Sequence, residues 1–327
     1  MKRELRRVVF AALALATLGA AAAESKCKLA QIAEWPLRPD HYRPVVDGVI
    51  NGHKVGIMLD TGAGMSVLHG TAVAKLGVTP GVGRAPRFFG LGGEARVETV
   101  VLDEFRIGDA VRRKWPAMLL GGERPTGDVV FYLGSDFFHQ LEVEFDLAHH
   151  AVRLFEATDC AAAALAYWSR DALEVPLEVG LKIEFAVKIN GRGFVAQLDS
   201  GAGRSTLSLP TAQALRLGPQ TPGVVSAGCI TGFGNERLDS WLATLESFAI
   251  GNEVIRNPRL PFADLWQHTR TETVGSNIRQ QVFKTPDLLL GADFLRTHRV
   301  LVSYSQSKLY FSYVGGTVFG TAPGKPC

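Results

Sequence analysis

The sequence predicts an all-β fold in which two homologous β-barrel lobes face each other across a central cleft. The first observation is length, because 327 residues suffice for about two domains that each bury a core. The second is a repeat: the sequence Leu-Asp-Thr-Gly-Ala-Gly at 59–64 returns as Leu-Asp-Ser-Gly-Ala-Gly at 198–203. The third is that the same features surround both copies in the same order, which distinguishes a tandem repeat from a chance match.

The first 23 residues are typical of a secretory signal peptide. A basic start is followed by an apolar run at 8–18 and by Ala21-Ala22-Ala23, after which cleavage is expected. The apolar run is shorter than the ~20 residues that a membrane-spanning helix needs. We therefore expect an exported protein, periplasmic or secreted, with no stable membrane insertion after the signal peptide is removed.

The formal charge of +3 belongs to this leader. Removing residues 1–23 takes away four basic side chains and one acidic side chain, which leaves a formally neutral chain. No dense patch of lysine and arginine with interleaved aromatic residues remains, so nucleic acid is not expected as a partner.

The four cysteines are compatible with two disulfides in an exported chain, and three pairings are possible. We expect Cys27 to pair with Cys160, because they flank the first repeat, and Cys229 with Cys327, because both lie in the second. Free buried thiols are the alternative. The cysteines are far apart and no CxxC or HxxxH spacing occurs, so no metal site is expected.

The repeat divides the chain into a first lobe at 24–160, a linker at 161–170 and a second lobe at 171–327. Residues 24–40 show no strong periodicity, and Pro36 and Pro39 argue against a helix there. The alanine run at 161–164 predicts either a short linking helix or an irregular connector. The polar stretch between Phe262 and Pro286 is longer than its counterpart in the first lobe and is expected to be a surface loop beside the cleft.

In each lobe a β-hairpin leads into the aspartate. Alternating apolar residues reach Asn51-Gly52 in the first copy and Asn190-Gly191 in the second, and this dipeptide favours a two-residue hairpin turn. The next strand then runs directly into the aspartate.

Three further features follow each aspartate turn. Short helices are expected at 70–76, ended by Gly77, and at 210–217, ended by Gly218. Glycine-rich hairpin tips come next, at 90–94 and 232–236. The last feature is an apolar pair followed by glycine, at 132–134 and 289–291, which leads into a final pair of strands.

With these motifs, residues 43–315 resemble the aspartic proteases, and within them the retropepsin-like (retroviral-type) branch found in bacteria, with two units fused in one chain. The resemblance implies two pepsin-like lobes, each contributing one half of the active site. It implies catalytic aspartates at Asp60 and Asp199, whose turns are supported by Thr61, Gly62, Ser200 and Gly201.

The chemistry of such a site explains these residue types. Two carboxyl groups about 3 Å apart cannot both ionise, so the pair would hold one proton and titrate as a unit. The charged member would act as general base on a water, while the protonated member donates to the oxygen of the scissile carbonyl. The hydroxyls would cross-link the two turns, and each glycine would permit a tight turn. No metal, cofactor or covalent intermediate is required.

The glycine-rich tips are expected to act as flaps that close over an extended peptide, held by main-chain hydrogen bonds with its side chains in pockets. The candidate flap and substrate-binding residues are Phe89, Gly90, Leu91, Gly92, Gly232, Phe233 and Gly234. Phe88 is a further candidate for lining a pocket, although such aromatic residues equally often pack under their own hairpin.

Two other residue pairs are expected to be structural. Asp136 and Asp293 follow the apolar-apolar-glycine strand in each copy, and the resemblance implies that they cap the next short helix. Ser66 and Ser205 are expected to hydrogen-bond within the turn, because no Gly-x-Ser-x-Gly elbow accompanies them.

The sequence therefore predicts an exported aspartic endopeptidase that hydrolyses peptide bonds in extended protein segments, using a water activated between Asp60 and Asp199. Because both aspartates lie in one chain, a monomer with an intramolecular pseudo-dimer is expected to suffice. The alternative is a non-catalytic peptide-binding or sensor protein on the same fold, since a fold does not by itself guarantee an activity.

Overall fold

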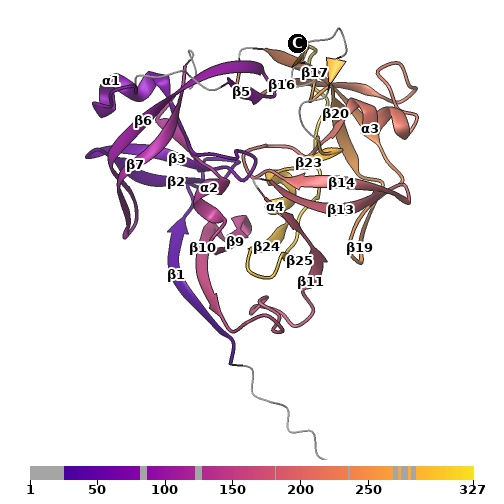
Figure 1. Ribbon diagram of the computed structural model, residues 1–327. Helices are drawn as coiled ribbons and strands as arrows, with labels where there is room; N and C mark the ends of the chain where they lie inside the picture. Colours follow the sequence, from indigo (N-terminus) through magenta and orange to yellow (C-terminus); the bar gives the residue numbers. More distant parts are fainter. Residues whose placement is uncertain are drawn as a thin grey trace, which may run out of the picture.

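A computed structural model describes residues 26–81, 87–121, 127–180, 182–234, 236–267, 272–273, 279–280 and 285–327. These residues form two β-rich lobes that stand side by side above a shared sheet (Figure 1). The expected signal peptide lies outside the described residues. Among the helices of the described part, none is long and apolar enough to cross a membrane.

The first lobe is a seven-stranded sheet with the order β2-β3-β8-β4-β7-β6-β5. A further pairing between β2 and β6 closes six of these strands into a barrel. The strands are β2 (Val45–Ile50), β3 (His53–Leu59), β4 (Val67–His69), β5 (Arg87–Gly90), β6 (Gly93–Ile107), β7 (Ala110–Leu120) and β8 (Val129–Leu133).

The second lobe repeats this arrangement in the order β16-β17-β20-β15-β23-β14-β13-β18-β19, with β12 paired to β13. Its strands are β12 (Glu178–Val179), β13 (Ile183–Ile189), β14 (Arg192–Leu198), β15 (Thr206–Ser208), β16 (Val225–Thr231), β17 (Arg237–Thr244), β18 (Ser247–Ile250), β19 (Glu253–Arg256), β20 (Arg259–Ala263) and β23 (Leu288–Leu290). The two-stranded sheet of β21 (Glu272–Thr273) and β22 (Arg279–Gln280) lies within the segment that was expected to be a surface loop.

Local sequence explains the hairpins that lead into each aspartate. In β13, Ile183, Phe185, Val187 and Ile189 are buried while the residues between them are partly or fully exposed, as expected for a strand with one face on the core. Both residues of each Asn-Gly turn have positive φ angles, 48° and 81° in the first copy and 48° and 76° in the second. Two consecutive positive φ angles are what a type I′ turn requires, so these turns fix the hairpins as predicted.

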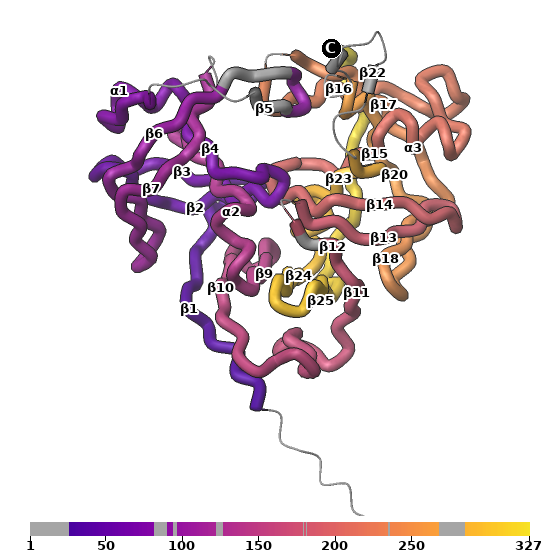
Figure 2. The backbone as a smooth tube through the Cα atoms, in the orientation of Figure 1, coloured from indigo at the N-terminus to yellow at the C-terminus, as the bar shows by residue number. Residues whose placement is uncertain are grey.

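A six-stranded antiparallel sheet joins the two halves of the chain, in the order β1-β10-β9-β24-β25-β11. The first half supplies β1 (Lys28–Pro36), β9 (Glu142–Asp146) and β10 (Ala151–Thr158), and the second supplies β11 (Leu173–Pro176), β24 (His298–Ser303) and β25 (Lys308–Tyr313). At its centre, Glu144 lies opposite Leu301 and Phe145 opposite Val300. The tube in Figure 2 shows the connector at 161–170 running beneath this sheet from β10 to β11.

Strand β1 is not predicted from the sequence, where residues 24–40 are expected to be an irregular lead-in. Eight of its nine residues are at least partly exposed, so it carries no clear apolar alternation. The strand forms because β10 offers a long free edge, where the register runs from Lys28 opposite Thr158 to Pro36 opposite Ala151. Pro36 is tolerated because it stands at the end of an edge strand.

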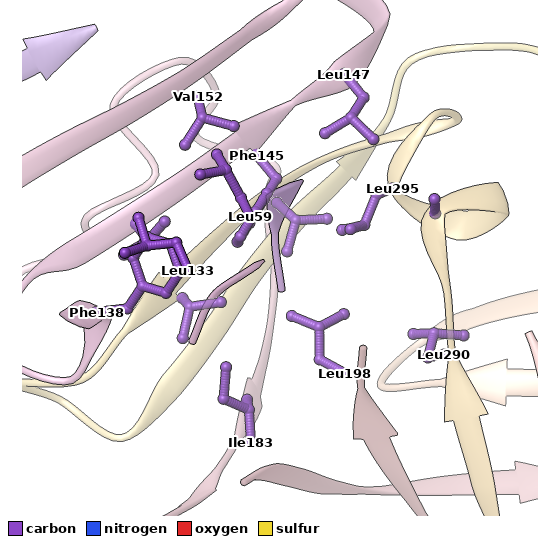
Figure 3. Close-up of a cluster of buried hydrophobic side chains, with 14 of the residues drawn as sticks. Leu59, Leu133, Phe138, Phe145, Leu147, Val152, Ile183, Leu198, Leu290 and Leu295 are labelled. Carbon is purple, nitrogen blue, oxygen red and sulfur yellow. The ribbon is translucent and has the colours of Figure 1, made fainter. Parts of the chain in front are cut away.

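One hydrophobic core runs from the first lobe into the second through the base of the molecule. Figure 3 shows its central part, where Leu59 and Leu133 from the first lobe lie near Leu198 and Leu290 from the second. All four side chains are fully buried. Each belongs to a strand that ends at the middle of the molecule, so the same packing that joins the lobes also fixes those strand ends.

The helices are short: η1 (Gly70–Ala72), α1 (Val73–Leu76), α2 (Ser135–Phe138), η2 (Leu147–His149), α3 (Leu209–Ala214) and α4 (Ala292–Leu295). Gly77 ends α1 in the left-handed conformation, as predicted. The predicted end of α3 was wrong, because the helix stops at Ala214 and the left-handed residue after it is Arg216 rather than Gly218. The connector at 161–170 is irregular, which is one of the two expected alternatives.

Both expected disulfides are present, and the alternative of free thiols is thereby excluded. Cys27 is bonded to Cys160, which ties the start of β1 to the end of β10. Cys229, in β16, is bonded to Cys327, which ties the last residue of the chain to the second lobe.

Candidate active site

The two aspartate turns meet at the middle of the molecule, where the lobes adjoin. Asp60 follows β3 and Asp199 follows β14. The backbone N–H of Asp60 donates to the carbonyl of Leu133 at 2.9 Å, and that of Asp199 donates to the carbonyl of Leu290 at 2.9 Å. These bonds extend the parallel pairing of β3 with β8 and of β14 with β23, so each turn is held from behind by the predicted apolar-apolar-glycine strand.

Four hydrogen bonds cross-link the two turns through Thr61 and Ser200. The Thr61 hydroxyl donates to the Leu198 carbonyl at 2.9 Å and accepts from the backbone N–H of Ser200 at 3.0 Å. The Ser200 hydroxyl donates to the Leu59 carbonyl at 2.7 Å and accepts from the backbone N–H of Thr61 at 3.0 Å. Both side chains are buried, so the network is shielded from water and the spacing of the turns is fixed.

This network brings the carboxyl groups of Asp60 and Asp199 close enough to influence each other directly. One oxygen of Asp60 accepts from the backbone N–H groups of Gly62 at 3.0 Å and Ala63 at 3.2 Å. One oxygen of Asp199 accepts from the N–H of Ala202 at 2.9 Å. Each carboxylate therefore has one oxygen fixed by its own turn.

Glycine is required at both positions that follow the hydroxyl residues. A Cβ atom added to Gly62 would lie 2.4 Å from Cγ of Asp199, and one added to Gly201 would lie 2.4 Å from Cγ of Asp60. Each glycine thus faces the carboxyl group of the opposite turn. The close approach leaves no room for a side chain.

The environment of the pair favours protonation. Burial raises the pKa of Asp60, although the N–H groups of Ala63 and Gly62 and the charge of Arg43 oppose this. Burial, followed by the negative charge of Asp60, raises the pKa of Asp199 to about 8. A carboxyl group that is withdrawn from water and faces a second carboxylate holds its proton more tightly, so the pair retains a proton near neutral pH.

Both lobes also have the same arrangement of a serine and an aspartate behind the turn. Ser66 donates to Asp136 at 2.7 Å and accepts from the N–H of Gly134 at 3.1 Å. Ser205 does the same with Asp293 at 2.6 Å and the N–H of Gly291 at 2.9 Å. The serines are structural, as expected, but their hydrogen bonds reach the segment behind the turn rather than staying within the turn.

The expected capping role was wrong for Asp136 and holds only in part for Asp293. Gly134 and Gly291 occupy the N-cap positions of α2 and α4, so no N-cap side chain caps either helix. Asp293 does accept from the N–H of Phe294 in the first turn of α4 at 2.9 Å. Both carboxylates also accept from the serine hydroxyls. Burial raises the pKa of Asp293.

Two residues near the aspartates were not singled out from the sequence. Arg43 precedes β2, and its guanidinium donates to the carbonyl of Gly201 in the opposite lobe at 3.2 Å. Tyr132 lies on β8, and burial, with the charge of Asp60 as a smaller cause, raises its pKa. The repeat could have indicated Tyr132, since it matches Leu289 of the apolar-apolar-glycine motif.

Two hairpins meet above the aspartates, and we name them the first flap (β5 and β6, with residues 90–93 at its tip) and the second flap (β16 and β17, with Gly232, Phe233 and Gly234 at its tip) (Figure 1). The N–H of Gly92 donates to the Phe233 carbonyl at 2.8 Å, and the N–H of Glu236 donates to the Gly92 carbonyl at 3.1 Å. The side chains of Phe88 and Phe89 lie outside the described part of the structure. The tips thus join the two lobes a second time, on the far side of the aspartates from the shared sheet.

Within the described ranges, no group of three or more histidine, cysteine, aspartate or glutamate side chains is placed to hold a metal ion. The titratable groups described at this site are the two aspartates, Tyr132 and Arg43.

A family model described as aspartyl protease matches the chain twice, at residues 46–137 and 185–294. The two matches coincide with the two tandem units and each contains one aspartate turn. A comparison with curated proteins finds no match.

Proposed function

Because the chain belongs to the aspartyl protease family, we propose that it is an exported endopeptidase that cleaves extended protein segments with Asp60 and Asp199 as its catalytic pair. The observation that supports this most strongly is the close approach of the two carboxyl groups, which four crossed hydrogen bonds hold in place. A decayed relative that only bound peptides would have no chemical need for this arrangement.

In the proposed reaction the two carboxyl groups share one proton. Charged Asp60 takes a proton from a water that lies between the two groups, and the resulting nucleophile attacks the scissile carbonyl carbon. Protonated Asp199 donates to the carbonyl oxygen as negative charge develops there. The proton held by Asp60 then passes to the leaving amine as the carbon–nitrogen bond breaks. The hydroxyl formed from the carbonyl oxygen returns its proton to Asp199 as the carbonyl re-forms, which restores the pair.

The surroundings of the pair support this division of roles. Each carboxyl accepts from two backbone N–H groups of its own turn, those of Gly62 and Ala63 for Asp60 and those of Gly201 and Ala202 for Asp199, so the turns alone do not distinguish them. Arg43 adds a positive charge that lowers the pKa of Asp60 against the effect of burial. A nearby cation stabilises the charged form, so Asp60 is assigned as the base.

We propose that the catalytic unit is a monomer with an intramolecular pseudo-dimer, made of lobes at 24–160 and 171–327 with a linker at 161–170. The shared sheet and the crossed hydrogen bonds supply the intramolecular contacts that two separate chains would otherwise have to make. Two disulfides suit an oxidising compartment, which supports export to the periplasm or the medium.

Cleavage of an unfolded protein between about pH 3 and 7 tests the proposal, since a dyad of this kind works while it holds one proton. Asp60→Asn and Asp199→Asn should each abolish cleavage. Asp103→Asn, which removes an exposed carboxylate paired with Lys114, serves as the matched control and should retain activity. Undiminished activity of either dyad variant would refute the proposal.

Binding of a statine-containing peptide separates this proposal from the non-catalytic alternative. Statine mimics the tetrahedral species, so the wild-type protein should bind it and also cleave ordinary peptides. Tight statine binding without turnover of any substrate would favour a peptide-binding or sensor protein. Gel filtration with activity measured on the monomer fraction tests the proposed assembly.

A further inference from the structure

Each flap tip reaches across the molecule and packs against the opposite lobe. Phe233 of the second flap contacts an apolar cluster of the first lobe, which we name the first apolar site: Val67, Val97, Met118, Leu120 and Tyr132. Leu91 of the first flap contacts an apolar cluster of the second lobe, which we name the second apolar site: Ile230, Ala263, Leu265, Trp266 and Leu289.

The two apolar sites flank the aspartate pair symmetrically. Tyr132 immediately precedes Leu133, whose carbonyl accepts the N–H of Asp60, and the charge of Asp60 acts on the Tyr132 hydroxyl. Leu289 occupies the matching position before Leu290, whose carbonyl accepts the N–H of Asp199. Each site therefore begins one residue away from the strand end that holds an aspartate.

The side chains of Phe233 and Leu91 pack closely against these sites. The ring of Phe233 meets the ring of Tyr132 edge to face, with centroids 4.9 Å apart and an interplanar angle of 79°. This is a favourable geometry for two aromatic rings. Leu91 packs near enough to the second flap that a Cβ atom on Gly232 would lie 2.8 Å from Cβ of Leu91.

Glycines allow the tips to interlock. A Cβ atom on Gly90 would lie 2.5 Å from the Phe233 carbonyl oxygen, and one on Gly92 would lie 2.8 Å from the Gly234 carbonyl carbon. The backbones also share two hydrogen bonds, Gly92 to Phe233 and Glu236 to Gly92. The contact between the flap tips thus consists of backbone hydrogen bonds and of the packing of two side chains, Leu91 and Phe233, against the opposite lobes.

We propose that Leu91 and Phe233 are intramolecular occupants of the two sites that receive substrate side chains beside the aspartate pair, so that the free protein is closed by its own flap tips. This inference rests on the proposed function for the identity of the competing ligand. A peptide binds only after both tips have left their sites, and its affinity is reduced by the fraction of time that the sites are filled.

Amide hydrogen exchange in the absence of any ligand tests whether the tips are seated. The amides of Gly92 and Glu236 should exchange at least about tenfold more slowly in the wild-type protein than in the double variant Leu91→Ala/Phe233→Ala, because loss of two seated side chains raises the population of the open tips. Leu91→Met keeps a side chain of similar volume and should exchange as the wild type does. Equal exchange in the wild type and the double variant would overturn the inference.

Calorimetry with the statine-containing peptide then tests competition. The double variant should bind it about tenfold more tightly than the wild type, since no occupant has to be displaced. Gly92→Ala, which keeps both apolar residues but prevents the close approach of the tips, should change affinity in the same direction. Val254→Ala, at an exposed position of β19 outside both flaps, is the matched control and should leave affinity unchanged.

Unchanged or weaker binding by the double variant would overturn the inference, because the tips would then hold the ligand rather than compete with it. Failure of the proposed function has a different signature: neither cleavage nor statine binding occurs in any form. Hydrogen exchange of the free protein still decides in that case whether Leu91 and Phe233 hold the tips closed.

Discussion

Replacing Gly62 or Gly201 by alanine should separate the two carboxyl groups without removing either of them. The added Cβ atom would lie 2.4 Å from the Cγ atom of the opposite aspartate, whereas ordinary contacts begin at 3.4 Å. The carboxyl group of Asp199 in Gly62→Ala, or of Asp60 in Gly201→Ala, must therefore move by about 1 Å. A misplacement of about 1 Å can cost about 100-fold in rate, which corresponds to about 2.7 kcal/mol of transition-state stabilisation.

The same turn offers a matched control in Gly203→Ala. A Cβ atom on Gly203 has its nearest described neighbour at 3.9 Å, in the ring of Tyr42, so the substitution fits without displacement. This variant should cleave at close to the wild-type rate. It differs from Gly201→Ala by only two positions in the chain, so it reports on general effects of replacing glycine in this turn.

The assay is kcat/KM for cleavage of an unfolded protein or a peptide that the wild type cleaves. Near-ultraviolet circular dichroism and thermal unfolding establish that each variant is folded before its rate is interpreted. If Gly62→Ala and Gly201→Ala retain kcat/KM within about threefold of Gly203→Ala while folded, the two carboxyl groups need not be in contact for catalysis. That result would refute the reasoning.

Three further predictions concern stability and the flaps. The pKa of Asp199 is raised from 3.8 to about 8, so between these values the folded protein holds a proton that the unfolded chain releases. The free energy of unfolding should therefore fall as pH rises from about 4 to 8, by up to about 1.4 kcal/mol per pH unit. Chemical denaturation at several pH values measures this slope, which should be lost in Asp199→Asn. Ser200→Ala leaves the Thr61 N–H and the Leu59 carbonyl without their hydrogen-bond partner, and it should lower the free energy of unfolding by about 1–3 kcal/mol. Ser200→Thr keeps a hydroxyl and should lose less stability. Equal losses in the two variants would contradict the role of the hydroxyl. Removing the disulfide between Cys229 and Cys327 in the variant Cys229→Ser/Cys327→Ser should lower the free energy of unfolding by about 2–4 kcal/mol and speed amide exchange in β16. Unchanged exchange in β16 would show that this disulfide does not restrain the second flap.

The features that could be predicted from the sequence are those whose chemistry is local. The Asn-Gly turns require positive φ angles at both residues, so the hairpins before Asp60 and Asp199 could be placed from two letters each. The aspartate turns could be recognised because hydroxyl and glycine must follow the carboxylate at fixed spacing. The repeat indicated that the two turns belong together, and the family resemblance implied that the hydroxyls of Thr61 and Ser200 cross-link them.

The features that could not be predicted depend on partners far along the chain. Strand β1 lacks apolar alternation and forms against β10, more than a hundred residues later in the chain, so no local signal marks it. Arg43 reaches Gly201 of the other lobe from a position with no motif. The seating of Leu91 and Phe233 likewise depends on which lobe each flap faces, and the glycine-rich sequence of the tips indicates only that they turn.

The shared sheet has a consequence for the ancestry of the chain. In β9 and β24, Phe145 faces Val300 and Val143 faces Val302, so the strands pair about an approximate twofold axis that passes between Glu144 and Leu301. A single ancestral half that paired with its own copy would place Glu144 opposite Glu144, in a position that is fully buried here.

The present chain avoids that repulsion because its halves have diverged. Arg299, from the second half, donates to Glu144 at 3.0 Å, and Arg153 of the first half also binds this carboxylate. The position in the first half that corresponds to Arg299 is Glu142, so a homodimer of first halves would gain acidic groups and lose this cation. The two halves therefore pair well with each other, whereas two copies of the first half would pair poorly. This difference favours keeping both halves in one chain.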